Sequence, residues 1–264
     1  TEKSFLLFNY LCKLLYFIKV QEILYADLGS ADYKQTWDFQ EQLLQQIMQL
    51  KLEGRNQGFG DHAPTPHYLL FCEHPHVFTL GKSGKPEHLL SNEQQLKNAH
   101  ATYYKINRGG DITYHGPGQV VGYPILNLDL FFNDIHHYMR LLEEVIIRTL
   151  NEYGIVGSRI EKLTGVWIDA GKPSARKICA FGVRCSRWIT MHGWALNVNT
   201  QLDYFNHIVP CGISDKAVTS MEKELGKNMN LDEVKSILLK HFSEVFNASI
   251  KNVGKEKLIV KERT

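Results

Sequence analysis

The sequence predicts an α+β fold, in which helices flank a central mixed, mainly antiparallel sheet. Short strand-like runs fill the middle of the chain, and segments with helical periodicity lie before, between and after them. The 264 residues can bury one substantial core, and 44% of them are hydrophobic against 22% charged. Since no internal repeat or linker divides the chain, we expect a single domain.

The elements are predicted in chain order from periodicity. Residues 33–52 carry apolar side chains near helical spacing, and the polar run at 54–66, rich in glycine and proline, predicts a loop. A second helix is predicted at 135–150, and a third follows Asn230, whose capping side chain precedes Glu233 in a variant of the capping box. Strands are predicted at 68–72, 77–80, 101–106, 120–128, 165–168, 177–183 and 191–198.

The ends of the chain are predicted to lie outside this domain. We expect an N-terminal extension over residues 1–22, a domain over 23–250 and a polar tail over 251–264. The apolar stretch at 5–20 contains two lysines and is shorter than the ~20 residues of a membrane span. No small-residue cleavage site follows it. We therefore expect no membrane span and a cytoplasmic location.

The net charge and the cysteine content argue against nucleic-acid binding, disulfides and a zinc site. A net charge of +2 gives no sign of nucleic-acid binding. The cysteines are odd in number and form no CxxC pair, which favours free thiols in a reducing compartment over disulfides or a zinc site. The histidines lack metal-ligand spacing, so we expect no metal. The five cysteines are Cys12, Cys72, Cys179, Cys185 and Cys211.

A glycine-rich segment at 108–119 is the strongest signal of a site. Its glycines let the backbone approach a ligand and present N–H groups to it, as acyl and anion sites require. A phosphate-binding loop does not explain the nearby Gly81, Lys82 and Ser83, because His76 stands where that motif needs a glycine.

Cys211 and Lys177 are candidates for acyl chemistry on sulfur. Cys211 lies on a Pro–Cys–Gly turn, and a nearby lysine could take the thiol proton and stabilise the thiolate. Taken singly, each residue is more often structural, since free cysteines are commonly buried and lysines commonly solvated. The motifs around them decide between a structural and a catalytic role for these two residues.

Ordered motifs over roughly residues 23–246 resemble the lipoyl (octanoyl) transferases. These enzymes move an octanoyl group from acyl carrier protein to lipoate-dependent proteins. The motifs are EHP at 73–75, TLG at 79–81, RGG at 108–110 followed by His115 and GQ at 118–119, TGVW at 164–167, RKI at 176–178, AFG at 180–182, HGWALN at 192–197 and PCG at 210–212.

This resemblance implies the fold of the biotin- and lipoate-protein ligase catalytic domain, with no cofactor. It implies that Cys211 is the acyl-thioester nucleophile and that Lys177 lowers the cysteine's pKa and relays protons. The implied donor is octanoyl-acyl carrier protein, and the acceptors are lipoyl domains of 2-oxoacid dehydrogenases and the glycine cleavage H protein, in the first step of lipoate biosynthesis. The implied substrate-binding residues are Arg108, Gly109, Gly110, Asp111, Ile112, Thr113, Tyr114, His115, Ala180, Phe181, Gly182, Gly193, Trp194 and Ala195.

Three alternatives remain open from the sequence. An ATP-dependent lipoate-protein ligase shares the implied fold, a non-catalytic module could bind acyl-carrier or lipoyl proteins, and a cysteine hydrolase would release the acyl group to water. Alternation along a strand places Cys179 on the same face as Lys177, where we expect it to be packed. We also predict a carrier-docking patch at Arg176, Arg184 and Arg187.

Overall fold

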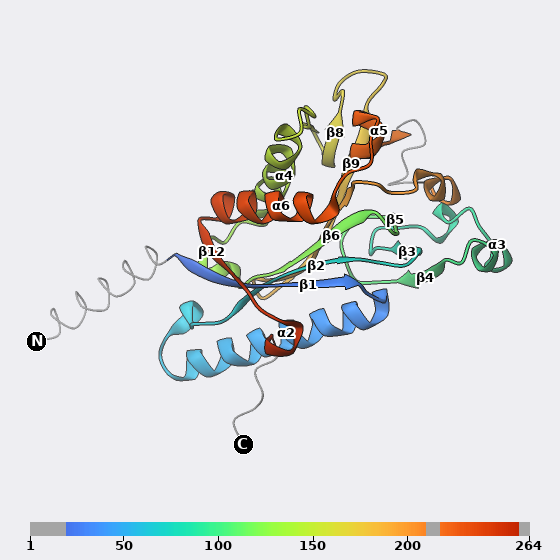
Figure 1. Cartoon of the computed structure of the whole chain (residues 1–264). Coiled ribbons are helices and arrows are strands. Elements are labelled where there is room, and N and C mark those ends of the chain that lie inside the picture. The colour runs from blue at the N-terminus through green and yellow to red at the C-terminus, as the bar shows by residue number, and fades with distance from the viewer. Residues whose placement is uncertain (1–19, 210–216, 259–264) are drawn as a thin grey trace, which may run out of the picture.

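The computed structural model describes residues 20–209 and 217–258 of the chain. Most of the expected N-terminal extension and the predicted turn with Cys211 lie outside these residues. In Figure 1 a long helix, α2 (Tyr33–Asn56), covers one face of a twisted sheet, and helices α4 (Ile135–Asn151) and α6 (Leu231–Phe246) cover the other. A smaller sheet lies beside one end of the large one. The predicted α+β fold with flanking helices is confirmed.

The large sheet is mixed and mainly antiparallel, as predicted. Its parallel pairs are β12–β1, β1–β2 and β11–β9, and the pairs from β2 through β6, β10, β9 and β8 to β7 are antiparallel. Along the sheet the strands are β12 (Ala248–Asn252), β1 (Gln21–Ser30), β2 (His67–Glu73), β6 (Gln119–Ile125), β10 (Ile189–Asn197), β9 (Arg176–Ser186), β8 (Leu163–Ile168) and β7 (Ser158–Ile160), with β11 (Ala217–Val218) beside β9.

The small sheet positions the glycine-rich segment. Its order is β4 (Thr102–Lys105), β3 (Val77–Leu80) and β5 (Ile112–His115), and the short helix α3 (Glu93–Asn98) precedes β4. The predicted strand at 77–80 is confirmed. Strand β5, which was not predicted, lies inside the glycine-rich segment and pairs antiparallel with β3. Residues 108–111 therefore form the loop that leads into β5.

The helices form where their caps and apolar faces predict. α2 (Tyr33–Asn56) is capped by Asp32, and α4 (Ile135–Asn151) is capped by Asp134. α6 (Leu231–Phe246) is capped by Asn230, which accepts hydrogen bonds from the N–H groups of Asp232 and Glu233. The predicted loop at 54–66 is shorter than expected, because α2 runs to Asn56 and a single 3₁₀ turn, Gly60–His62, follows. A short helix, α5 (Met221–Leu225), follows β11.

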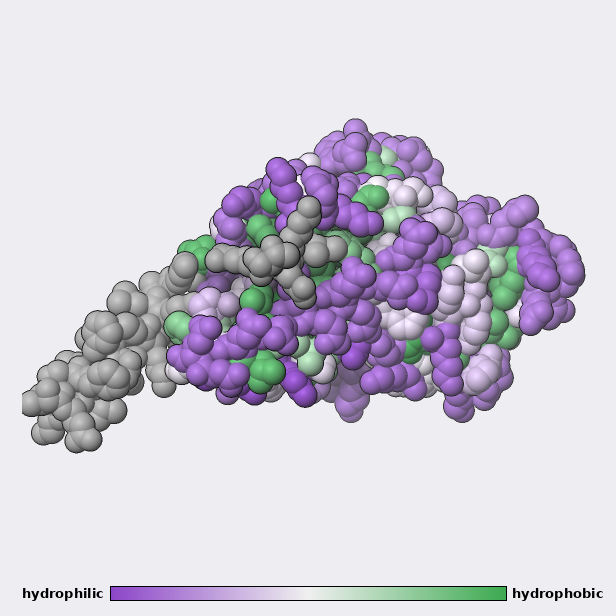
Figure 2. Space-filling model, turned by 90° about the horizontal axis from the view of Figure 1, so that it is seen from below, coloured by the Kyte–Doolittle hydropathy of each residue, from purple (hydrophilic) through white to green (hydrophobic). Residues whose placement is uncertain are grey.

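Two hydrophobic cores lie on the two faces of the large sheet. Leu43, Leu44 and Ile47 of α2 pack on one face, and α4 and α6 pack on the other. Cys179 is fully buried in the second core, as expected. Figure 2, which views the molecule from the side of α2, shows a mainly hydrophilic surface with small separate hydrophobic areas.

A buried ion pair fastens the C-terminal part of α2 to the sheet. The ammonium group of Lys51 contacts the carboxylate of Asp129, and the two side chains are only 5% and 2% exposed. Lys51 also donates to the main-chain oxygen of Arg187 at 2.8 Å. The helix is thereby tied to the turn between β9 and β10.

Both expected domain boundaries fall inside strands. β1 begins at Gln21, within the expected extension, and β12 continues to Asn252, past the expected limit at 250. Leu258 is fully buried against the α2 side of the sheet. Among the described residues, no helix is long and apolar enough to cross a membrane.

Candidate active site

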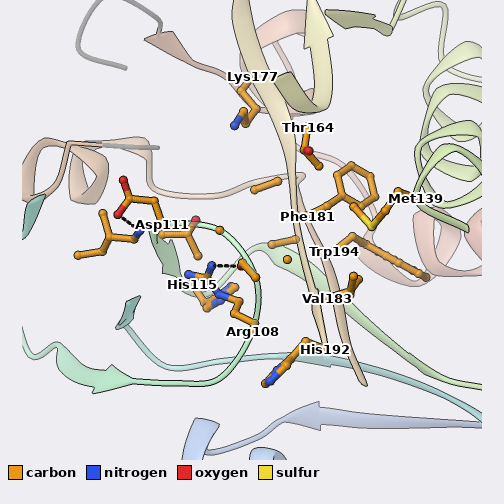
Figure 3. A pocket seen from close by; sticks show the side chains of 18 of the residues that line it. Arg108, Asp111, His115, Met139, Thr164, Lys177, Phe181, Val183, His192 and Trp194 are labelled. Carbon is orange, nitrogen blue, oxygen red and sulfur yellow. Dashed lines mark hydrogen bonds between the residues drawn. The ribbon is translucent and has the colours of Figure 1, made fainter. Parts of the chain in front are cut away.

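A cavity of about 500 Å³ lies between the glycine-rich loop and strands β9 and β10. Its walls come from the loop at 108–111, from β9 and β10, from the first turn of α4 and from residues 162–164. It extends along β9 from Lys177 to Val183, a span of about 20 Å at about 3.3 Å per residue. Figure 3 shows Lys177 and Thr164 at one end and His192 at the other.

The two long walls of the cavity differ in chemistry. Met139 of α4, Phe181 of β9 and Trp194 of β10 gather on one side (Figure 3). Arg108 and Asp111 of the glycine-rich loop lie on the other side. An apolar wall facing a loop rich in backbone polar groups suits a ligand with a hydrocarbon chain and a polar head.

Glycine allows the loop to lie directly on β9. A Cβ atom at Gly182 would stand 2.8 Å from Cδ of Arg108 and 2.9 Å from the oxygen of Gly109. The N–H of Gly109 donates to the oxygen of Val183 at 2.9 Å. Because that donor is already used, Gly109 holds the loop on the sheet, and Gly182 supplies the clearance.

The buried side chain of Arg108 stabilises the glycine-rich loop. Its guanidinium is buried and donates to the oxygen and the hydroxyl of Thr79, at 2.6 and 3.0 Å, and to the oxygen of Gly109 at 3.0 Å. Thr79 belongs to β3, so the arginine links the cavity loop to the small sheet. This accounts for an arginine among the glycines.

His115 is held as a neutral imidazole. Its Nδ1 lies 2.8 Å from Oε1 of Gln119, whose amide group donates to Asn197 at 2.9 Å. The amide of Asn197 donates in turn to the oxygen of Thr219, which fixes the orientation of both amides, so that Nδ1 of His115 is the donor. Burial lowers the pKa of His115 to about 3.

His192 is a second buried histidine in the cavity wall. Its φ of +59° is uncommon for a residue with a side chain and marks a strained position within β10. Nε2 lies 2.9 Å from Oδ1 of Asn107, and burial lowers the pKa of this histidine to about 3. His192 opens the HGWALN motif, and the structure places it in the cavity wall.

Lys177 lies half-buried at one end of the cavity. Its ammonium nitrogen is 4.6 Å from the ring centre of Trp167 in β8, within the range of a cation–π contact. A Cβ atom at Gly165 would stand 3.1 Å from Cε of Lys177. The glycine of the TGVW motif therefore leaves room for the lysine side chain.

Cys211 lies outside the described residues, but the chain is fixed on both sides of it. Before it, the N–H of Val209 donates to the oxygen of His88 at 2.8 Å. After it, β11 pairs with β9, so that Val218 lies opposite Lys177. The described chain therefore resumes beside the lysine.

The structure brings together all but one of the fourteen substrate-binding residues inferred from the motifs. Tyr114 is the exception, because strand alternation turns its side chain to the opposite face of β5. There its hydroxyl lies 2.7 Å from Nδ1 of His76, and its ring packs against Phe78. Tyr114 belongs to the core of the small sheet and does not line the cavity.

Two of the three arginines of the predicted patch, Arg176 and Arg184, are engaged in ion pairs. Arg176 is paired with Asp169 and Glu224, and Arg184 is paired with Glu41. The two arginines stand eight residues apart on β9, about 26 Å. Glu224 and Glu41 lie 48 and 143 residues away from their arginines, so local charge alone could not reveal these pairs.

Sequence reasoning missed part of the lining. The TGVW and HGWALN motifs contain Thr164 and His192 but did not assign either residue to the site, and periodicity along α4 predicted a buried face without showing which side chains reach a cavity. The missed lining residues are Tyr33, Tyr123, Ile135, His136, Met139, Lys162, Leu163, Thr164, Val183 and His192.

Residues 32–243 match the family model of the lipoyl protein ligase A/B catalytic domain. The chain belongs to this family. An octanoyltransferase of Christiangramia forsetii is 60% identical over 232 residues, which cover 88% of this chain and 98% of that protein. An octanoyltransferase of Bacteroides fragilis is 50% identical over 213 residues, which cover 81% and 93%. The enzyme class predicted from the motifs, octanoyltransferase, is thereby confirmed.

Solved structures agree on the fold. A crystal structure of lipoate-protein ligase A bound with ATP superposes with a TM-score of 0.64, at 17% identity and with coverage of 91% and 92%. The bipartite lipoate protein ligase of Thermoplasma acidophilum gives 0.65, at 17% identity and 90% coverage of each chain. At this identity the likeness shows the ligase-type fold alone.

Proposed function

We propose that this octanoyltransferase takes its acyl group from acyl carrier protein and passes it, through a thioester on Cys211, to a lysine of a lipoate-dependent protein. The observation that carries the proposal is the cavity that joins Lys177 to an apolar wall and a glycine-rich loop. Cys211 stands two residues after Val209 and six before Ala217, and these two residues are anchored next to His88 and Arg176.

The acyl chain is proposed to lie along the apolar wall. Met139, Phe181 and Trp194 offer it hydrocarbon and aromatic surface, and the thioester end points toward Lys177. Burial of the hydrocarbon chain against this wall stabilises the bound acyl group at roughly 25 cal/mol per Å² of apolar surface. The loop at 108–111 closes the opposite side.

The first half-reaction exchanges one thioester for another. Lys177, as the neutral amine, takes the proton of the Cys211 thiol, and the thiolate attacks the acyl carbonyl. The tetrahedral intermediate expels the carrier's pantetheine thiolate, which receives the proton from the lysine ammonium. No ATP is consumed, since the acyl group arrives already activated.

The second half-reaction forms an amide. The acceptor's lysine amine attacks the thioester carbonyl, Lys177 removes a proton from the attacking nitrogen, and the C–S bond breaks. The Cys211 thiolate then recovers the proton. In each turnover Lys177 therefore moves one proton from Cys211 to the carrier's thiolate and one proton from the acceptor amine to the Cys211 thiolate.

An ATP-free transfer assay tests this proposal. Octanoyl-acyl carrier protein and a lipoyl domain are supplied without ATP, and octanoylated domain is measured by mass spectrometry. We expect transfer with the carrier substrate and none with octanoate plus ATP. Transfer from octanoate that requires ATP would establish the ligase alternative, and octanoate release without acceptor would establish the hydrolase alternative.

A further inference from the structure

The segment at 86–91, to which the sequence assigned no role, connects two parts of the site. It follows the 81–84 turn, begins with the 3₁₀ turn Pro86–His88 and then runs extended. Its central feature is His88, whose Nδ1 lies 2.6 Å from Oδ2 of Asp111. The two side chains are 20% and 12% exposed. An ionised carboxylate can only accept, so Nδ1 of His88 is the donor.

Asp111 is fixed on its other side by the cavity loop. Its Oδ1 accepts a hydrogen bond from the N–H of Ile112 at 2.7 Å, and a Cβ atom at Gly84 would stand 2.7 Å from the same oxygen. The N–H groups of residues 81–83 also donate to the oxygens of Asp111, Arg108 and Gly110. The carboxylate therefore joins His88 to the loop that closes the cavity.

The backbone of the same segment holds the chain that leads to Cys211. The oxygen of His88 accepts from the N–H of Val209 at 2.8 Å, and the N–H of Leu90 donates to the oxygen of His207, also at 2.8 Å. Between them, Leu89 and Ile208 form an antiparallel bridge. Residues 207–209 are thus paired with 88–90 up to the last described residue before Pro210.

We propose that His88 is a positioning residue for acyl transfer. Its imidazole holds the carboxylate of Asp111 in place and with it the cavity loop. Its main-chain carbonyl holds Val209, which stands two residues before Cys211. This inference rests on the proposed function, because it assigns to Cys211 the attack that His88 helps to place. One hydrogen bond then couples the wall of the acyl cavity to the approach of the nucleophile.

Matched substitutions test the hydrogen bond. His88→Asn keeps an N–H donor near the position of Nδ1, and His88→Leu is of similar size without a donor. Single-turnover acylation of the intact enzyme by octanoyl-acyl carrier protein is followed by mass spectrometry. We expect His88→Leu to slow acylation at least about 10-fold, because small misplacements of reacting groups have such effects, and His88→Asn to restore most of the rate. The KM for the carrier should change little.

Three controls separate positioning from loss of stability. His241 on α6 also contacts two carboxylates, Glu152 and Glu244, and His241→Ala should leave the acylation rate unchanged. Asp111→Ala should match His88→Leu, and the double variant should be no slower than either single one.

The outcomes distinguish this inference from the proposed function. Absence of an acyl adduct in the native enzyme would overturn the thioester proposal itself. An adduct formed equally fast by native enzyme and His88→Leu, or equal losses in His88→Leu and His88→Asn, would overturn the positioning role. If His88→Leu does not fold, His88→Phe, which keeps a ring but has no donor, takes its place in the comparison with His88→Asn, and equal rates overturn the role.

Discussion

Gly122 of β6 supports the indole of Trp194, and adding one methyl group there should reshape the acyl cavity. A Cβ atom at this position would overlap the indole and stand 2.7 Å from its Cη2. Phe71 and Phe242, with ring centres 5.7 and 5.9 Å from that of Trp194, restrict the indole's other movements. Gly122→Ala should therefore push the indole toward the cavity, at a cost in unfolding free energy of about 1–3 kcal/mol.

Thermal unfolding and chain-length preference report the two consequences. In a domain of this size each kcal/mol lowers Tm by roughly 2–4 °C. A displaced indole shortens the apolar wall, so kcat/KM should fall more for octanoyl- than for hexanoyl-acyl carrier protein. Both effects should be partly reversed by adding Trp194→Phe, because the smaller ring leaves space for the new methyl group.

The control is a glycine without close neighbours. Gly154 has φ +72°, and no atom lies within 4 Å of the point that a Cβ atom would occupy there, so Gly154→Ala should lower Tm by backbone strain alone. It should leave chain-length preference unchanged. A Gly122→Ala variant with native Tm and native preference, or no recovery on adding Trp194→Phe, would refute the steric reasoning.

Three further predictions follow from the contacts. Lys177→Arg keeps the charge but removes a usable base, so turnover should collapse while the circular dichroism spectrum stays native, and near-normal kcat would contradict proton relay. Lys51→Met leaves Asp129 charged and buried, so it should lower the free energy of unfolding in urea by about 3–5 kcal/mol. The double variant with Asp129→Leu should lose less of this free energy, and an equal or larger loss would contradict the role of the buried pair. Burial lowers the pKa of His115 and His192 to about 3 from the ordinary 6.5, so their neutral forms contribute stability that is fully present above pH 6.5 and is lost as pH falls toward 3. Between pH 6.5 and 3, each of the two histidines should lower the free energy of unfolding by up to about 1.4 kcal/mol for each unit that the pH falls. A free energy of unfolding in urea that does not change between pH 7 and 5 would exclude this.

Sequence patterns predicted the elements with one strongly buried face. The helix at 135–150 and the strand at 77–80 match α4 and β3 closely, because periodic burial needs only local information. β1 was not predicted, although Ile23 and Tyr25 are buried in alternation, because it adjoins the apolar stretch at 5–20. β5 has only four residues and lies among glycines, where strand propensity gives little signal.

The site was predictable only where a motif named it. The glycine-rich loop and the β9 and β10 residues came from the ordered motifs, and all but Tyr114 line the cavity. Met139 and His88 carry no comparable signal, since their roles arise from neighbours far away in the chain. The neutralised Arg176 shows the same limit, because its partner Glu224 is 48 residues distant.

Intact-protein mass spectrometry tests the thioester on Cys211 most directly. The enzyme is mixed with octanoyl-acyl carrier protein in the absence of ATP, beside its Cys211→Ser and Cys179→Ser variants. We predict one octanoyl adduct in the native and Cys179→Ser proteins, none in Cys211→Ser, and discharge of the adduct onto a lipoyl domain. An adduct that persists in Cys211→Ser, or transfer by that variant at the native rate, would contradict the proposed mechanism.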